Sequence, residues 1–246
     1  MISIVHGLLA ILVGTLTAEL AMGDDATLKS SVVKIVQYAA TVEIGAGFIV
    51  KAEKDVVYIL TASHVVGSAN TVKVYFLDRP NSPVELDIRD IPRQPDQNTG
   101  LALIYITPTG LIPPGLRPLS IDATELTSED NLVAIGHPRI GADWSMDRGN
   151  YAGPKGSGLT FTMPLSEGNS GGPVIRNGKV VALITEATKN PKAFGVPASA
   201  LLQYLKGNQI QVADSSDNIN ISTAQNDDKC KLADPPITPC LFREKK

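Results

Sequence analysis

The sequence predicts an all-β fold that ends in one helix. Between Ser31 and about Val196, short runs rich in Val, Ile, Leu, Thr or Tyr alternate with Gly, Pro, Asn or Asp, and helical periodicity is nearly absent. Many short strands without intervening helices are typical of a sandwich or of barrels. The chain has 246 residues, enough for one large all-β domain or two small ones.

The expected strands are Ser31–Tyr38, Thr41–Val50, Val56–Thr61, Val72–Leu77, Leu101–Ile106, Leu132–Ile135, Val180–Thr185 and Ala193–Val196. The proline-rich stretch 107–120 is a poor strand or helix, so we expect it to separate two sub-domains, about 31–107 and 120–197. The glycine-rich stretch 153–158 lacks the spacing of a phosphate-binding loop, and we expect it to be a mobile loop.

A helix is expected at residues 198–206, because this stretch is rich in Ala and Leu and Gly207 follows it as a C-terminal cap. The folded domain would then span residues 24–207. Residues 208–246 are rich in Asn, Asp, Ser, Gln and Pro and are predicted to form a flexible tail. Cys230 and Cys240 suit a small disulfide loop in an oxidising compartment, and two reduced cysteines in a cytosolic protein are the alternative.

The amino-terminal segment has the order of a signal peptide. Ile2–Leu16 is mostly apolar, and small residues precede Asp24 and Asp25, so we expect residues 1–23 to be removed by cleavage near Gly23. A membrane anchor is the alternative, but the run is shorter than the roughly 20 apolar residues of a spanning helix. We therefore expect a secreted or periplasmic protein with no stable membrane span after cleavage.

Composition excludes several classes of function. The net charge is −3 and aromatic residues make up 5% of the chain, which argues against a nucleic-acid-binding protein. Neither cysteine has a Cys-x-x-Cys partner or a nearby His, so no zinc site is expected. No metal and no organic cofactor are predicted, and the sequence does not indicate the oligomeric state.

The strongest chemical signal is the heptapeptide Glu167-Gly-Asn-Ser-Gly-Gly-Pro173. Glycines around Ser170 permit a tight turn that exposes the hydroxyl. The same turn allows the N–H groups of Gly168 and Ser170 to converge and hold the oxyanion of a tetrahedral intermediate. A glycine-rich hairpin with an incidental serine is the alternative reading.

The second signal is His64, in Thr61-Ala-Ser-His-Val-Val66. A serine hydroxyl needs an adjacent base, and His has a suitable pKa near neutrality. The chain has three histidines; His6 lies in the predicted signal peptide and His137 in a Gly-His-Pro turn. We therefore expect His64 to be the general base.

These two motifs resemble the catalytic-histidine and catalytic-serine motifs of trypsin-like serine peptidases. Gly45–Val50, Gly178–Ile184 and Phe194–Pro197 resemble strands of the bacterial Deg (HtrA) branch of that family. The resemblance covers about Ser31 to Leu205. It implies two packed six-stranded antiparallel β-barrels with the active site between them, and protein or peptide substrates. The PDZ-type peptide-binding domain that Deg relatives often carry is not expected here.

The resemblance also implies an acid that orients His64, and here the sequence departs from the family pattern. Gly100 stands directly before the Leu-Ala-Leu-Ile strand, where relatives carry that acid. Asp96 is the nearest carboxylate, and it is either the orienting acid or a solvated loop charge. Without an orienting acid, the enzyme would be slow or would use water or Asn98. Asn169 stands where digestive relatives carry an Asp, so activation through an ion pair with a new amino terminus is not expected.

By the same resemblance, the primary substrate pocket is lined by Pro164, Leu165, Thr185, Ala187 and Gly195. None of these side chains is charged, and a pocket without a buried carboxylate disfavours Lys and Arg. We therefore expect a preference for small or medium apolar residues, with Glu186 near the rim. Two functions remain open: an active endopeptidase, or a pseudo-peptidase that keeps the fold as a protein- or peptide-binding module.

Overall fold

The structure is a computed structural model that describes residues 25–38, 41–67, 70–87, 98–107, 112–187 and 192–212. The chain divides into two units, residues 1–215 and 216–246, and every described residue belongs to the first. The predicted signal peptide, Asp96 and the two cysteines, Cys230 and Cys240, lie outside the described residues. The expectations that concern them stay predictions.

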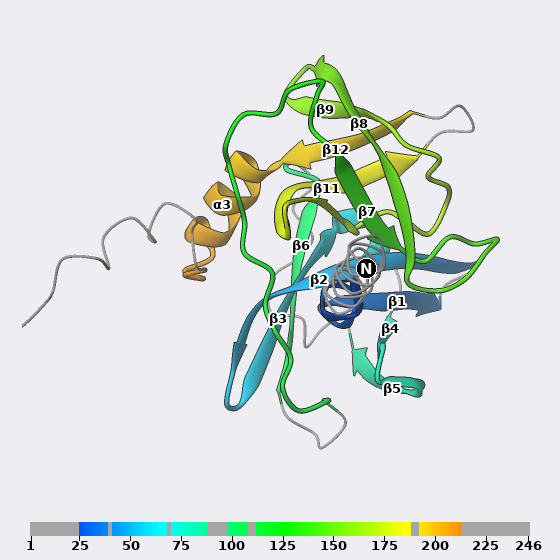
Figure 1. Ribbon diagram of the computed structural model, residues 1–246. Helices are drawn as coiled ribbons and strands as arrows, with labels where there is room; N and C mark the ends of the chain where they lie inside the picture. The colour runs from blue at the N-terminus through cyan, green and yellow to red at the C-terminus, as the bar shows by residue number, and fades with distance from the viewer. Residues whose placement is uncertain are drawn as a thin grey trace, which may run out of the picture. The chain divides into compact units, whose positions relative to one another are not determined.

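The first half of the fold is a six-stranded antiparallel sheet (Figure 1). Its strands are β1 (Val32–Tyr38), β2 (Val42–Glu53), β3 (Val56–Ala62), β4 (Thr71–Phe76), β5 (Arg79–Asp87) and β6 (Leu101–Ile106), and their order is β5-β4-β1-β2-β3-β6. In β4, buried residues alternate with half-buried ones, as expected for a strand with one face on the core. The ladders that join the described residues leave β5 and β6 at the two edges of the sheet.

The second half is a closed antiparallel barrel of six strands. Its strands are β7 (Leu132–Gly136), β8 (Ser145–Lys155), β9 (Gly158–Thr162), β10 (Pro173–Arg176), β11 (Lys179–Ala187) and β12 (Ala193–Pro197), and their order is β10-β11-β12-β9-β8-β7. The predicted trypsin-like all-β fold with a C-terminal helix is thus confirmed. The ladders close this second half into a barrel, whereas those among the described residues of the first half form a sheet with two edges.

One local expectation was wrong. The stretch 153–158, expected to be a mobile loop, ends β8, turns through Gly156 and Ser157 and begins β9, with Lys155 paired to Gly158. Gly156 has a φ of +60°, which suits a two-residue hairpin turn. The glycines of this stretch therefore make a β-hairpin.

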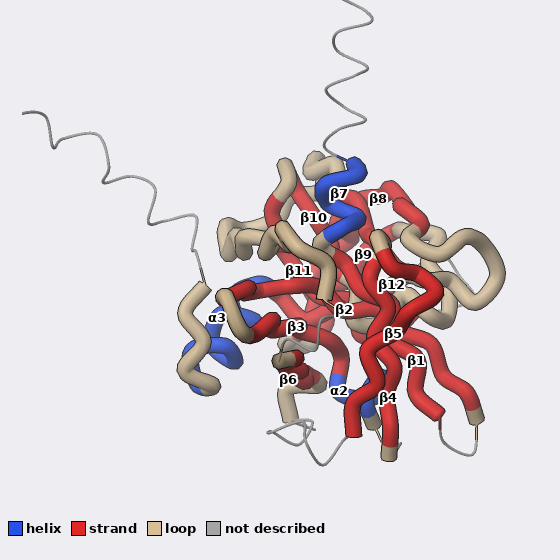
Figure 2. Tube along the Cα trace, turned by 90° about the horizontal axis from the view of Figure 1, so that it is seen from below, coloured by secondary structure: helices blue, strands red, loops and turns tan. Residues whose placement is uncertain are grey.

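Two helices are named within the described residues, and residues 25–30 are also helical. The helix α3 (Ala198–Gly207) packs on β11 and β12 and buries Ala198, Leu201, Tyr204 and Leu205. The other named helix, α2 (Ser63–Val66), is one turn long and follows β3 directly (Figure 2). Within the residues described here, no helix has the length and apolar character needed to cross a membrane.

The two halves share one hydrophobic core. Phe48, Ile59 and Leu60 of the first sheet belong to the same buried cluster as Val180 and Leu183 of the second barrel. Such a core holds its side chains at nearly crystalline density, so the halves form one stiff scaffold for residues placed between them.

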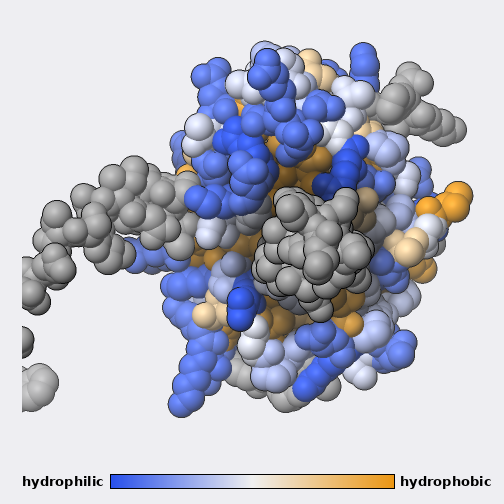
Figure 3. Space-filling model, viewed as in Figure 1, coloured by the Kyte–Doolittle hydropathy of each residue, from blue (hydrophilic) through white to orange (hydrophobic). Residues whose placement is uncertain are grey.

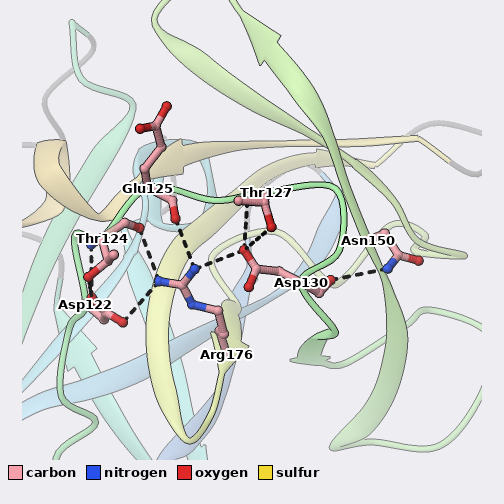
Figure 4. A network of polar contacts seen from close by, with 7 residues as sticks. All are labelled: Asp122, Thr124, Glu125, Thr127, Asp130, Asn150 and Arg176. Carbon is pink, nitrogen blue, oxygen red and sulfur yellow. Dashed lines mark hydrogen bonds and ion pairs between the residues drawn. The ribbon is translucent and has the colours of Figure 1, made fainter.

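The segment that joins the halves is fixed by Arg176 at the end of β10 (Figure 4). The Arg176 guanidinium lies 3.2 Å from an oxygen of Asp122 and 2.9 Å from one of Asp130, and it also donates to the carbonyls of Thr124 and Glu125. The Thr127 backbone N–H and Arg176 hold the pKa of Asp130 below its ordinary value. The segment before β7 is therefore held by a network of charged hydrogen bonds.

Candidate active site

His64 is placed by the junction of β3 with α2. The Ser63 N–H donates to the carbonyl of Gly100 at 2.9 Å, and the Gly67 N–H donates to the carbonyl of Ser63. These bonds end the strand and form one helical turn. The side chain of His64 stays exposed, whereas its neighbours Val65 and Val66 are buried. A buried strand therefore delivers the imidazole to the surface at a fixed position.

Ser170 lies on a tight turn that touches the first sheet. The Ala46 N–H of β2 donates to the Ser170 carbonyl at 2.7 Å, and the Gly171 N–H donates to the carbonyl of Ile184. Gly171 has a φ of +85°, and a Cβ at this position would overlap the carbonyl oxygen of Ala46. Only glycine fits both the conformation and the close approach, which explains the residue after Ser170.

His64, Ser170 and Gly168 line one pocket of about 290 Å³ at the surface. The remaining lining residues are Glu43, Ile44, Val65, Arg139 and Glu167. The residues come from β2, α2, the β7–β8 loop and the turn before β10. The structure therefore brings together His64 and Ser170, which the sequence analysis singled out, with a predicted oxyanion donor beside them.

The hydroxyl of Ser170 donates to the carbonyl oxygen of Thr185, with an Oγ–O distance of 3.3 Å. The backbone N–H groups of Gly168 and Ser170 donate to no acceptor in the part of the chain that the structure describes. Gly168 has a φ of +100°, which turns its peptide units into a conformation that other residues rarely adopt. Both N–H groups are thus unpaired within the described residues.

The electrostatic environment of His64 depends on two opposing effects. Desolvation by the surrounding protein lowers the pKa of His64 below its ordinary value, and the negative charge of Glu43 works in the opposite direction. Glu43 is held by Gln37, whose Nε2 donates to the Glu43 carboxylate at 2.7 Å and lies 3.5 Å from the backbone carbonyl of His64. The net effect favours the neutral imidazole.

Asp96, the predicted orienting acid, is not among the described residues. Asn98, which the sequence analysis considered as its substitute, is exposed. Gly100 uses its carbonyl to hold Ser63, next to His64. Among the described residues, Glu43 is the carboxylate whose charge acts on His64.

The turn that carries Ser170 also buries Asn169. The Asn169 Nδ2 donates to the carbonyl of Ser166 at 3.2 Å, and the residue is 2% exposed. A Cβ on Gly136 would overlap the Asn169 Oδ1, so the glycine makes room for this amide. Asn169 thus packs against the start of the β7–β8 loop without carrying a charge.

A second pocket, of about 530 Å³, lies beside the first. Pro164, Leu165 and Ala187, all predicted to line the substrate pocket, line it together with Ile140, Ser166 and the Arg139–Glu167 pair. Thr185 and Gly195 are not among the residues that line it: the Thr185 carbonyl accepts the hydrogen bond from Ser170, and Gly195 lies on β12, where an added Cβ would crowd the Leu183 carbonyl. Glu186 is exposed on β11.

An apolar side chain stands at the rim of this pocket. Ile140, in the loop between β7 and β8, is 93% exposed. Figure 3 shows apolar surface at the right rim of the molecule, over the loop that joins β7 and β8 in Figure 1. The nearby Arg139 and Glu167 form an exposed ion pair at 3.1 Å.

Comparison with known families decides the assignment. The family model described as the trypsin-like peptidase domain matches residues 45–183, more than half of the chain. This chain belongs to the trypsin-like peptidase family. The match begins at Gly45 and includes both His64 and Ser170.

Solved structures agree with the assignment. The active form of the Rv3671c protease from M. tuberculosis is 25% identical, with a TM-score of 0.60, and the match covers 77% of this chain and 84% of that one. The inactive form of the same protease is also 25% identical, with a TM-score of 0.58 and coverage of 75% and 91%. A serine endoprotease from Yersinia pestis has the same fold at 21% identity, with a TM-score of 0.58 and coverage of 76% and 66%. A search of curated proteins found no match.

The peptidase is therefore a trypsin-like serine endopeptidase, a hydrolase whose substrates are proteins. In the described part of the peptidase, no three His, Cys, Asp or Glu side chains are grouped in a way that would hold a metal ion.

Sequence reasoning missed three residues around this site: Glu43, Arg139 and His137. Glu43 acts on His64 because β1 and β2 pair with Gln37 opposite Glu43. Arg139 and His137 reach the Ser170 turn through backbone hydrogen bonds to Glu167 and Gly168. No local motif marks such contacts, which depend on strand register and loop packing.

Proposed function

We propose that Ser170 is the nucleophile of this endopeptidase and that His64 is its general base. The observation that carries this proposal is the single pocket lined by His64, Ser170 and Gly168. A nucleophile, a neutral imidazole and backbone N–H donors in one cleft are the parts that acyl transfer needs.

In the first half-reaction, the Ser170 hydroxyl turns from the Thr185 carbonyl toward His64. Its oxygen bonds to the scissile carbonyl carbon while its proton passes to the imidazole. The N–H groups of Gly168 and Ser170 donate to the oxyanion that forms. The intermediate then collapses: the C–N bond breaks, the imidazolium protonates the leaving amine, and an acyl ester on Ser170 remains.

In the second half-reaction, water attacks the acyl ester and gives its proton to His64. The new tetrahedral intermediate expels the Ser170 oxygen, which takes that proton back from the imidazolium. The products are a carboxylic acid and the free enzyme.

Two carboxylates are candidates to stabilise the imidazolium that forms in both steps. Asp96 is the one that the family resemblance indicates. Glu43 is the second candidate, because it lines the pocket and its charge acts on His64. A carboxylate near the ring favours the protonated state that the reaction passes through.

We further propose a preference for small or medium apolar residues at the cleavage position. Pro164, Leu165 and Ala187 give the 530 Å³ pocket apolar walls, and its Glu167 carboxylate is paired with Arg139. A Lys or Arg side chain would enter without an unpaired carboxylate to receive it, and desolvating an unpaired charge is costly.

A catalytically impaired binding protein is the second candidate. Two observations favour it: the Ser170 hydroxyl donates to Thr185, and the imidazole of His64 has no hydrogen-bond partner within the described ranges. In that case the cleft would hold a peptide segment without cutting it.

A fluorophosphonate probe separates these candidates because it labels an activated serine without a known substrate. We expect the parent protein to be labelled, and Ser170→Ala and His64→Ala not to be. Ser157→Ala, in the exposed turn between β8 and β9, is the matched control and should label like the parent. If the folded parent is not labelled, the binding protein is the better assignment.

A further inference from the structure

His137 is buried inside the loop between β7 and β8, close to the Ser170 turn. Its side chain is 0% exposed, and its ring meets the ring of Trp144 edge to face, with centroids 4.6 Å apart. Trp144 itself has a φ of +54°, a conformation that a bulky residue adopts only where the surroundings hold it. The indole is anchored by a 2.8 Å hydrogen bond from Nε1 to the carbonyl of Val32.

The ring nitrogens of His137 have different surroundings. Nδ1 lies 3.3 Å from the backbone nitrogen of Trp144 and accepts its hydrogen bond when the ring is neutral with its proton on Nε2. Asp143 Oδ1 lies 3.4 Å from the same Nδ1, and Asp143 Oδ2 pairs with Lys34 Nζ at 2.7 Å. Nε2 is buried, and a backbone hydrogen bond with Val33 favours a proton on the ring.

The backbone of residues 137–139 fixes two peptide units of residues 167–170. We call residues 167–170 the oxyanion loop. The Arg139 N–H donates to the Glu167 carbonyl at 2.8 Å, and the His137 N–H donates to the Gly168 carbonyl at 3.3 Å. A trans peptide is planar, so a fixed Glu167 carbonyl aims the Gly168 N–H in the opposite direction. This N–H is one of the two proposed oxyanion donors.

The turn at residues 137–139 lies in close contact with the oxyanion loop. A Cβ on Gly168 would lie on the carbonyl oxygen of His137, so the glycine is needed for the approach. A shift of the His137 turn is therefore transmitted directly to the oxyanion loop.

We propose that neutral His137 is a positioning residue that holds the oxyanion loop in its catalytic conformation, and that protonation of its ring releases this loop. The inference rests on the proposed roles of Gly168 and Ser170. His137 does not contact the substrate; it acts through Trp144 and through its own backbone.

Protonation releases the loop because it removes an acceptor. An imidazolium carries a proton on Nδ1, which then faces the carboxylate of Asp143 and no longer accepts from the Trp144 N–H. Trp144 loses the bond that supports its left-handed conformation, and the turn at 137–139 keeps only its backbone hydrogen bonds to Glu167 and Gly168. Burial lowers the pKa of His137 to about 4, with the Asp143 charge opposing this effect and the Lys34 charge adding to it. The release is thus confined to acidic conditions.

Fluorescence tests the first part of the inference, the protonation of buried His137, without any activity measurement. Trp144 is the only tryptophan in the chain, so its emission reports the neighbouring ring, and an imidazolium in contact with an indole quenches it. We expect the parent emission to fall with a midpoint near pH 4 while far-UV circular dichroism stays constant. In His137→Asn, whose side chain does not titrate, the step should be absent. The same step in His137→Asn, or a step that coincides with loss of circular dichroism, would overturn the switch.

Kinetic measurements test the second part of the inference, that His137 positions the oxyanion loop. His137→Leu removes the acceptor and should lower kcat about 100-fold with KM changed less than about three-fold, because only the oxyanion interaction is lost. His137→Asn offers an amide oxygen to the Trp144 N–H and should recover most of kcat. Full kcat in a folded His137→Leu protein would refute the positioning role. If the parent is inactive but shows the fluorescence step, the proposed function fails while the titration of His137 stands.

Discussion

The backbone N–H of Ala46 donates to the carbonyl of Ser170 at 2.7 Å and so joins β2 of the first sheet to the turn of the nucleophile. The carbonyl of Ala46 in turn accepts from the buried hydroxyl of Thr61, at 2.6 Å. Thr61 lies near the end of β3, shortly before His64. The base and the nucleophile are therefore linked by two hydrogen bonds through a single residue of β2.

Gly171→Ala should break this link. The new Cβ would overlap the Ala46 carbonyl and the Thr61 hydroxyl in a left-handed backbone conformation. A displacement of about 1 Å at the nucleophile can cost about 100-fold in rate, so we expect a loss of that size in fluorophosphonate labelling. Gly178→Ala is the matched control: its φ is +76°, but nothing lies within 4 Å of the added Cβ. The control should lose about 1 kcal/mol of stability and keep its labelling rate.

Glu43→Gln should move the acid limb of the pH profile of kcat/KM to lower pH. The Glu43 charge raises the pKa of His64, so its removal lets that pKa fall further. A general base works in its neutral form, so activity is lost as the pH falls through the pKa, and a lower pKa extends activity into more acidic solution. Glu53→Gln, at the far end of the same strand, should leave the profile in place. A shift of the limb to higher pH would contradict the assigned role of Glu43.

Arg176→Met should destabilise the fold without changing the pocket that holds His64 and Ser170. The guanidinium is 11% exposed and holds Asp122 and Asp130, which would lose their ion-pair partner and keep only the hydrogen bonds from Thr124 and Thr127. Charged hydrogen bonds of this kind contribute about 2 kcal/mol each, so we expect a loss of at least about 2 kcal/mol in the free energy of unfolding by urea. Arg148→Met, an exposed position on β8, should change it by less than about 0.5 kcal/mol.

Ala187→Leu should narrow the substrate preference. The larger side chain fills part of the 530 Å³ pocket that Ala187 lines. We expect kcat/KM for substrates with Leu at the cleavage position to fall about ten-fold relative to those with Ala, as excess volume in an apolar pocket typically does. Peptides that differ only at this position provide the measurement. Faster cleavage of Arg or Lys peptides by the parent enzyme would refute the apolar pocket itself.

Strands with a clear apolar pattern could be predicted from the sequence. The expected strand Val56–Thr61 is β3 but for one residue, and Leu101–Ile106 is β6. By contrast, β8 has no buried residue, and β5 contains two prolines and lies at a sheet edge, where proline is tolerated. Neither strand has the alternation that marks a half-buried strand, so neither was expected.

The residues of the site also divide into those that a local sequence motif predicts and those that it does not. Ser170 and His64 have local sequence motifs. An exposed nucleophile needs a glycine-rich turn, and the general base lies directly after a buried strand. Glu43 and His137 have none: Glu43 reaches His64 through the pairing of β1 with β2, and His137 acts through the packing of one loop on another. A Gly-His-Pro turn indicates an exposed bend, and its complete burial follows only from the tertiary structure.

His137 should also make the fold sensitive to acid. Its pKa of about 4 in the folded state lies below its value of 6.5 in the unfolded chain, so between these pH values the unfolded state binds more protons. The free energy of unfolding should therefore be unaffected above about pH 6.5 and should decrease as the pH falls toward 4. Over this window the contribution of His137 is about 3 kcal/mol, at 1.36 kcal/mol for each pKa unit. Urea unfolding at pH 7 and pH 4 measures it. His137→Asn removes the titrating group and should lose about 3 kcal/mol less than the parent over the same interval. Equal losses in the two proteins would mean that His137 titrates alike in both states, and the acid sensitivity would then belong to the carboxylates.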